Sequence, residues 1–479
     1  MKLARLVGVV LPALIAGVAT AQERGDIAIA GGHVVDPASG TYRAYNVLVR
    51  AGRIVAITDA PVEADRVIDA SGLIVAPGFI DILASLPPSR EPQRYKVMDG
   101  VTTVVSMHGG PVDIPGWYGS LEAEGSLVNY GTTVGHADIR NAAGLTDRYA
   151  AATPEQLMRM QEIAARAIDE GAVGIGFGIN YVPGASYEEI IAMFDVAARH
   201  GVPAHVHSRY KGSVFPETIV QSVQELITAA AVTGARTQLV HVASSAIGSM
   251  STVLDMIEGA RAHGVDIMAD VYPYLANSTR LESALFDEGW QERFGGITYD
   301  SIMLVDTGER LNERTFRAWR ERGATIITFF IPEREMVMAL KHPYVMVGSD
   351  GVIEDGKGHP RGAGTFSRVV GRFVREEGWL TLMEALRKVT IMPAQRIERA
   401  AESMSLRGRL AEGAYADITV FDANTLIDRA TYRKPAQYSQ GIEYVLVNGT
   451  LVVDGGELVE GVAPGRPIRH KAVIDDGDR

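Results

Sequence analysis

The segment IVAPGFIDILASLPPS, from Ile74 to Ser89, opens the part of the sequence that decides the fold. Its first residues form a short apolar run that ends in Pro77-Gly78-Phe79-Ile80-Asp81, which is typical of a buried strand followed by a carboxylate. The next three residues, Ile82-Leu83-Ala84, are apolar again. Whether a functional site lies here therefore depends on the residues at the ends of the other strands.

Beyond this segment, apolar runs alternate with helical stretches. One clear helix is Pro154–Glu170, which Thr153 can cap and which has Pro154 in its first turn. This alternation predicts an α/β fold with a parallel sheet, most economically a (β/α)8 TIM-like barrel. A doubly wound open sheet is the alternative, and recurring polar residues after the strands disfavour it. The apolar runs are Thr102–Met107, Val173–Phe177, Ala204–His207, Thr237–Val242, Asp266–Val271 and Val345–Gly348.

Both ends of the chain are rich in predicted strands. Asp26–Ala30, Asn46–Arg50 and Arg53–Thr58 lie near the start, and similar runs cover Ala416–Asp422 and Tyr444–Gly449. We expect them to form one small β-sandwich domain. The predicted organisation is a signal peptide at 1–21, an N-terminal part of the β domain at 22–75, a catalytic barrel at 76–400 with an insertion near 280–324, and the rest of the β domain with a tail at 401–479.

The N-terminus has the features of a secretory signal. Lys2 and Arg5 precede an apolar segment from Leu6 to Ala16, and Ala19-Thr20-Ala21 supplies a small-x-small cleavage pattern. An uncleaved anchor is the alternative, but the apolar run is shorter than the roughly 20 residues that a spanning helix needs. These features predict a periplasmic or secreted protein without membrane contact after cleavage.

The composition of the 479 residues is that of an ordinary globular protein, with 47% apolar and 22% charged residues. The net charge is −12 and no block of Lys and Arg stands out, which argues against a nucleic-acid partner. No cysteine is present, so neither disulfides nor thiolate ligands are available. The oligomeric state is left open.

Polar residues that suit a metal-dependent hydrolase follow many of the predicted strands. A lone histidine after a strand is usually structural, but a barrel would bring several of them to one mouth. Imidazole and carboxylate are expected ligands of Zn²⁺, which lowers the pKa of a water molecule for attack on a carbonyl. An aspartate would then accept the proton of that water. The residues concerned are Asp81, His108, His136, His205, His207, His241, Asp270 and Asp350.

The sequence resembles the amidohydrolase superfamily and, within it, the D-aminoacylase (N-acyl-D-amino-acid deacylase) group. The resemblance covers some four hundred residues and depends on many motifs in the same order. They are GGHVVDPASG, DASGLIVAPGFID, DGVTTVV, VGHADIR, EGAVGIGFGINYVPG, ADVYPYLANST, VGSDG, HPRGAGTFSRVVGRFVREEGWL and LRGRLAEGAYADITVFD. It implies hydrolysis of the linear amide of an N-acyl amino acid or small peptide, often of D configuration.

The resemblance also implies roles for single residues. His205 and His241 match the two histidines that hold the more buried metal, and Asp350 matches the general base. Arg361 matches an arginine that binds the substrate's α-carboxylate. Tyr181, Tyr272 and Ser278 fall where the family lines its substrate pocket, although Tyr181 is equally compatible with simple packing.

The sequence departs from the family in four places. The His-x-His expected after the first strand is absent, which removes the usual ligands of a second metal. Where the family has a bridging cysteine, only His108 offers a donor. Ala243 replaces the basic residue often found two positions after the His241 equivalent. The family motif His-x-Arg-x-Glu, aligned on His205, keeps its histidine and changes the rest.

The resulting prediction is one Zn²⁺ per chain, held by His108, His205 and His241 with a position left for water and with Asp350 as base. His207 is a weaker candidate because alternate strand residues lie about 6.6 Å apart along the strand, and His136 is also weaker. One alternative is a degenerate barrel that binds a peptide or acyl-amino acid without cleaving it. Another is a hydrolase of a cyclic or L-configured amide.

Overall fold

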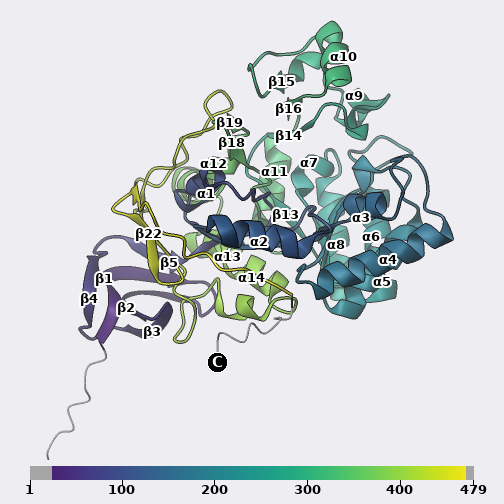
Figure 1. Cartoon of the computed structure of the whole chain (residues 1–479). Helices are drawn as coiled ribbons and strands as arrows, with labels where there is room; N and C mark the ends of the chain where they lie inside the picture. Colours follow the sequence, from purple (N-terminus) through teal and green to yellow (C-terminus); the bar gives the residue numbers. More distant parts are fainter. Residues whose placement is uncertain (1–23, 471–479) are drawn as a thin grey trace, which may run out of the picture.

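The structure is a computed structural model that describes residues 24–470. The predicted signal peptide, residues 1–21, lies outside this range. A β-rich body packs beside a larger α/β body, and the segment around β14–β16 forms a lobe at the top of Figure 1. Within the described residues, no helix is long and apolar enough to cross a membrane.

A nine-stranded sheet joins the two ends of the chain, as predicted. Strand β20 near the C-terminus pairs antiparallel with β5 near the N-terminus, so that Ile418 lies opposite Pro77. The order is β23-β22-β21-β20-β5-β1-β2-β3, with β4 also paired to β1. The strands are β1 (Arg24–Asp36), β2 (Thr41–Arg50), β3 (Arg53–Thr58), β4 (Glu63–Asp69), β5 (Ile74–Pro77), β20 (Ile418–Phe421), β21 (Ile442–Val447), β22 (Thr450–Asp454) and β23 (Glu457–Leu458).

The central part of the chain contains two parallel sheets, ordered β6-β7-β8 and β17-β13-β12-β11-β10-β9. Their strands are almost fully buried, as parallel strands covered by helices should be. The alternation of strands and helices that the sequence predicted is therefore present. The strands are β6 (Phe79–Asp81), β7 (Val101–Ser106), β8 (Asn129–Thr132), β9 (Val134–Gly135), β10 (Ile175–Gly178), β11 (Ala204–His207), β12 (Thr237–Leu239), β13 (Ile267–Val271) and β17 (Val345–Val347).

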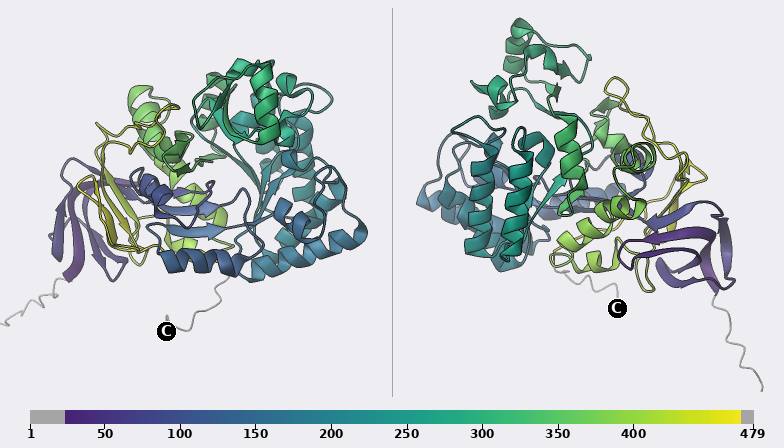
Figure 2. Two further views of the ribbon diagram at one scale, coloured as in Figure 1. Left: turned by 45° about the horizontal axis from the view of Figure 1, so that its top comes forward. Right: turned by 180° about the vertical axis from the view of Figure 1, so that it is seen from behind.

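Helices connect the parallel strands and lie to the outside of them (Figure 2). The helix predicted from Pro154 runs as α4 (Pro154–Asp169), and Thr153 and Gln156 form a reciprocal capping box at its start. The other helices of this body are α1 (Arg90–Val97), α2 (Ile114–Glu124), α3 (His136–Ala142), α5 (Tyr187–His200), α6 (Ile219–Thr233), α7 (Val242–Ser245), α8 (Met250–Ala262), α11 (Glu333–Lys341), α12 (Arg361–Arg368), α13 (Leu382–Val389) and α14 (Ile391–Ile397).

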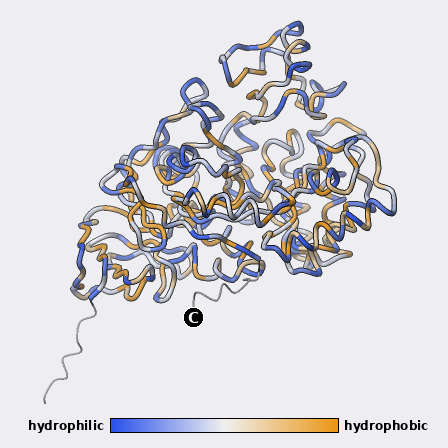
Figure 3. The backbone as a smooth tube through the Cα atoms, viewed as in Figure 1, coloured by the Kyte–Doolittle hydropathy of each residue, from blue (hydrophilic) through white to orange (hydrophobic). Residues whose placement is uncertain are grey.

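The lobe at the top of Figure 1 has a small core of its own. Strands β14 (Ala276–Arg280), β15 (Ile302–Leu304) and β16 (Thr325–Phe329) form an antiparallel sheet in the order β14-β16-β15. Trp290 of α9 (Trp290–Arg293) stacks on Phe316 of α10 (Glu313–Arg322) at 5.1 Å between ring centroids. Hydropathy plotted along the chain shows many hydrophilic residues on the outer turns of this lobe (Figure 3).

Candidate active site

Four polar side chains meet just beyond the carboxyl ends of parallel strands. His108 follows β7, His207 ends β11, His241 follows β12 and Asp350 follows β17. His241 and Asp350 have left-handed backbone conformations, with φ of 35° and 50°. Such a conformation is uncommon outside glycine, and it turns each side chain where the strand stops.

The three histidines form a cluster that suits a metal ion. One nitrogen from each of His108, His207 and His241 lies within 4.8 Å of the other two. His108 Nε2 is 3.2 Å from His207 Nδ1. Zinc–nitrogen bonds of about 2.1 Å in a tetrahedral site place two nitrogens about 3.4 Å apart, so small side-chain shifts would complete the geometry.

Neighbouring groups hold His241 in place. Its Nδ1 lies 2.9 Å from Ser244 Oγ, which leaves Nε2 free to act as a ligand. Its backbone N–H donates to Asp270 Oδ1 at 2.6 Å. Asp270 also accepts from Gln238 and is fully buried, and this burial raises its pKa to about 7. Asp270, predicted as a polar residue after its strand, thus supports a ligand rather than joining the cluster.

The electrostatic environment favours neutral imidazoles. Burial lowers the pKa of His108 below its ordinary value, and it lowers the pKa of His207 and of His241 much further. Metal ions bind the neutral form of histidine. In addition, His207 Nε2 is buried and has no hydrogen-bond partner among the described residues. A buried polar atom without a partner is costly, and a metal ion would satisfy it, so this donor set fits zinc.

His205, predicted as a ligand, is not a member of this cluster. It faces the same side of β11 as His207 but lies two residues deeper in the fully buried strand. Its electrostatic neighbours include Arg396 and Arg236 as well as His108, and neither ring nitrogen has a hydrogen-bond partner within residues 24–470. The geometry favours His207 in the place that we predicted for His205.

The missed signal is visible in the sequence. Aligned on His207 instead of His205, the family motif His-x-Arg-x-Glu matches His207-Ser208-Arg209, and only the last residue changes, to Lys211. The spacing argument from a regular strand ranked His207 lower because it did not use this match. A ligand at the end of a strand, where the backbone leaves the sheet, is the geometry that the structure shows.

His136, the other weaker candidate, has a partner elsewhere. Its Nε2 lies 2.7 Å from Glu189 Oε1, and the same carboxylate accepts two 2.6 Å contacts from Arg140 Nη1. All three side chains are almost completely buried. This arrangement ties α3 to α5, and it gives no geometric support to His136 as a metal ligand.

Asp350 lies beside the histidine cluster and is paired with Arg361. The distance from Asp350 Oδ1 to His108 Nδ1 is 3.9 Å, and Arg361 Nη2 lies 2.8 Å from Asp350 Oδ2. Arg361 is buried, and its Nε and Nη1 have no hydrogen-bond partner among the residues that the structure describes. The guanidinium can therefore orient Asp350 and still offer a free edge to a carboxylate.

A buried ionic network fixes the backbone on either side of Asp350. Lys96 Nζ donates to Asp81 Oδ2 at 2.9 Å, to Ser349 Oγ at 2.9 Å and to the Gly351 carbonyl at 3.0 Å. The N–H of Ser349 donates to Asp81 Oδ1 at 2.9 Å. Asp81, predicted as a site residue, thus acts with Lys96 to join the ends of β6 and β17.

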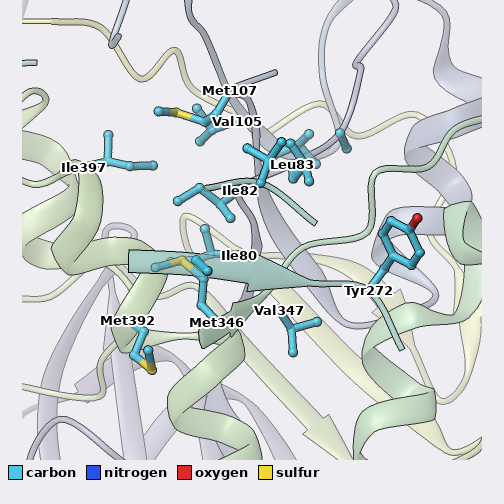
Figure 4. Close-up of a cluster of buried hydrophobic side chains, with 14 of the residues drawn as sticks. Ile80, Ile82, Leu83, Val105, Met107, Tyr272, Met346, Val347, Met392 and Ile397 are labelled. Carbon is cyan, nitrogen blue, oxygen red and sulfur yellow. The ribbon is translucent and has the colours of Figure 1, made fainter. Parts of the chain in front are cut away.

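Apolar side chains occupy the place where the family's His-x-His is missing. Leu83 is fully buried and belongs to the same hydrophobic cluster as Val105 and Met107, beside Ile82 (Figure 4). Its carbonyl accepts a 2.5 Å hydrogen bond from the N–H of Asp350. Leu83 thus contributes core packing and backbone support for Asp350, and it offers no side-chain ligand for a second metal.

The residues predicted to line a substrate pocket surround Arg361 and His207. The guanidinium carbon of Arg361 lies 4.4 Å from the ring centroid of Tyr272, and its Nη2 is 3.5 Å from the Ser278 carbonyl. Tyr181 packs edge-on against His207 at 4.9 Å, and its hydroxyl lies 3.1 Å from Thr279 Oγ1. Tyr181 therefore both packs and borders the site.

An open cavity of about 400 Å³ adjoins the cluster. His108 and Asp350 form its inner wall, and Leu86, Pro111 and Trp117 supply apolar surface farther out. Its size and its mixed lining suit a small organic ligand.

A further basic residue near the site was not predicted. Lys211 is 2% exposed and interacts electrostatically with both Asp350 and Arg361, and burial lowers its pKa to about 7. The aligned motif would have pointed to it, because a lysine stands there where the family has a glutamate.

Comparison with known proteins defines the class. The model described as "Amidohydrolase family" matches residues 174–453, which is more than half of the chain. The fold and the histidine cluster agree with this match. The chain belongs to the amidohydrolase family and is an enzyme of that class, as its sequence motifs predicted.

Within the family, the chain is similar to N-acyl-D-amino-acid deacylases. N-acyl-D-glutamate deacylase of Alcaligenes xylosoxydans xylosoxydans is 36% identical over 497 residues, covering 95% of this chain and 98% of the relative. D-aminoacylase of the same organism is 32% identical, covering 89% of this chain and 94% of the relative.

Solved structures give the same picture. N-acyl-D-glutamate deacylase from Bordetella bronchiseptica, in complex with zinc and a phosphonate mimic of the tetrahedral intermediate, is 32% identical with a TM-score of 0.83. It covers 93% of this chain, and all of that structure is matched. A D-aminoacylase studied for one-metal activation and second-metal attenuation is 28% identical with a TM-score of 0.81, with the same coverage of both chains.

Proposed function

We propose that the protein is a mononuclear, zinc-dependent deacylase of N-acyl-D-amino acids. The observation that carries the proposal is the cluster of His108, His207 and His241 beside Asp350, with Leu83 in the core where a second pair of ligands would start. The similarity to N-acyl-D-amino-acid deacylases supports the substrate class. The D-aminoacylase studied for one-metal activation supports a single ion.

The fold that presents this site is proposed to be a closed (β/α)8 barrel. Counting β8 and its continuation β9 as one strand, the two parallel sheets supply β6, β7, β8–β9, β10, β11, β12, β13 and β17, which is eight strands. The link between β6 and β17 is made by the Asp350 N–H and the Leu83 carbonyl. We also propose a cleaved export signal at 1–21 and a split β domain at 22–75 and 401–479, with the barrel between its two parts.

The residues have distinct roles in the proposed reaction. A zinc ion held by the three histidines supplies Lewis acidity and lowers the pKa of water. Asp350 accepts the proton of the attacking water and passes it to the leaving nitrogen of the amide. Arg361 binds the substrate carboxylate through its free edge while its Nη2 keeps Asp350 oriented. The cavity lined by Trp117 and Leu86 receives the acyl group.

Matched histidine variants test the metal site. His207→Ala is expected to reduce zinc from near one ion per chain to a small fraction, because two imidazoles are too few for a stable catalytic site. His205→Ala should keep its zinc because His205 is not a member of the cluster. Metal analysis after dialysis measures both variants, and circular dichroism checks their folding. Zinc lost from the folded His205 variant but retained in the His207 variant would reverse the ligand assignment.

The role of Arg361 is tested through the substrate carboxylate. Arg361→Lys is expected to raise KM for N-acetyl-D-amino acids about 10- to 100-fold, because an ammonium cannot replace the two-pronged contact of a guanidinium. The methyl esters of the same substrates should be affected much less. Equal losses for acid and ester would contradict carboxylate binding by Arg361.

A screen of N-acetyl-D- and N-acetyl-L-amino acids, with zinc measured in the same samples, tests the proposed activity as a whole. Release of the free D-amino acid by the zinc-loaded protein supports it. Stoichiometric binding of the same compounds without turnover would instead identify a degenerate amidohydrolase that acts as a binding protein. Preference for L-amides would place the enzyme outside the proposed substrate class.

A further inference from the structure

Lys211 is held at the edge of the site by its neighbours in sequence. The N–H of Gly212 donates to the Ser245 carbonyl at 2.8 Å, which ties this segment to the end of α7. Gly212 has a φ of 69°, and a Cβ atom there would lie 2.7 Å from the carbonyl oxygen of Arg293. The segment is thus confined between α7 and the lobe, and Lys211 Nζ lies 5.5 Å from the ring centroid of Phe294.

The ammonium of Lys211 has no counter-charge of its own. It is buried, and within residues 24–470 no carboxylate or carbonyl accepts a hydrogen bond from it. The nearby carboxylate of Asp350 already pairs with Arg361 at 2.8 Å. Burying an unpaired cation costs several kcal/mol. The arrangement is therefore incomplete without an anion.

Lys211 also faces the same space as the reacting groups. Its charge acts on Asp350 and Arg361, and it acts on His108, His207 and His241. Lys211 and Arg361 repel each other, and an anion between them would relieve this repulsion. Arg361 directs two N–H-bearing nitrogens, Nε and Nη1, at no described partner.

The sequence explains why a lysine is needed at this place. Position 243, on α7, has lost the basic residue that related sequences often have two positions after the second histidine ligand. Lys211 lies on a neighbouring loop that is bonded to the end of the same helix. A cation has thus been removed from one element of the site and introduced on an adjacent one.

We propose that Lys211 binds the substrate's α-carboxylate together with Arg361, in place of the basic residue missing at position 243. This inference rests on the proposed function, since it assigns a further specificity residue to the same site. Arg361 provides the two-pronged contact and Lys211 provides a point charge on the other side of the carboxylate. Lys211 takes no part in proton transfer.

The test compares N-acetyl-D-methionine with its α-carboxamide in the zinc-loaded protein. Lys211→Met is expected to raise KM for the acid about 10- to 100-fold with little change in kcat, and to leave KM for the amide nearly unchanged. Lys211→Arg should recover most of the loss. Lys341→Met, an exposed position at the end of α11, serves as a control with no expected change.

A binding measurement separates failure of this inference from failure of the proposed function. Titration calorimetry with N-acetyl-D-methionine on the Asp350→Asn protein reports binding without turnover, and Lys211→Met in that background should weaken it about 10- to 100-fold. Equal affinity with and without Lys211 would overturn the inference whether or not the protein is a deacylase. A loss confined to N-acetyl-D-glutamate, with N-acetyl-D-methionine unaffected, would also overturn it, because Lys211 would then bind a side-chain carboxylate.

Discussion

Replacement of Asp350 by asparagine is expected to lower kcat roughly 100- to 10,000-fold, because it removes the group that accepts and returns the proton. Asparagine has nearly the same shape, and it tolerates the left-handed backbone that position 350 requires, with φ of 50°. The histidine cluster should keep its zinc. The measurement is kcat for the released D-amino acid, together with the zinc content of the same sample.

Asp355 provides a matched control for this experiment. It lies five residues further on, has the same φ of 50°, and is exposed. Asp355→Asn therefore makes the same chemical change in the same backbone conformation, away from the histidines, and should leave kcat unchanged. Full activity in Asp350→Asn, with zinc bound, would remove Asp350 from its role as the base.

Replacement of Lys96 by methionine is expected to lower the free energy of unfolding by about 3–5 kcal/mol, because Asp81 would remain buried as an uncompensated charge. The side chains of Lys96 and Asp81 are 2% and 0% exposed. Methionine preserves most of the length of the lysine side chain, so that loss of the charge dominates the effect. Urea unfolding of the two proteins measures the difference.

The same substitution should also lower kcat, since Lys96 and Asp81 fix the backbone of Ser349 and Gly351 around the base. An exposed pair gives the control: Lys357 lies 2.8 Å from Asp306, with side chains 54% and 74% exposed. Lys357→Met should cost about 0–1 kcal/mol. Equal unfolding midpoints for the two variants would show that the buried network contributes no special stability.

Much of the fold could be predicted because it depends on local patterns. The alternation of apolar runs with amphipathic stretches indicated parallel strands and helices, and Thr153 and Pro154 marked the start of α4 correctly. The pairing of β20 with β5 was predicted from the similar strand patterns at the two ends of the chain. The strands predicted from the apolar runs begin or end within one to three residues of the observed ones.

The site was predicted less completely, because the direction of a side chain at the end of a strand depends on the loop after it. Regular strand geometry places His205 and His207 on the same face and cannot decide which of them meets His108. His241 enters the cluster through a left-handed residue that no periodicity reveals. The charge of Lys211 faces the site only because the Gly212 turn is confined by α7 and the lobe.

The sequence by itself determined the family, the order of strands and helices, the loss of the second pair of metal ligands, and the places of Asp350 and Arg361. These depend on residue types and spacings, which are properties of the chain alone. Only the tertiary structure decided that His207 joins His108 and His241, that Leu83 belongs to the core, and that a lysine from one loop stands near the place of a base lost from another. Each of these depends on distances between segments far apart in the sequence, and packing alone sets those distances.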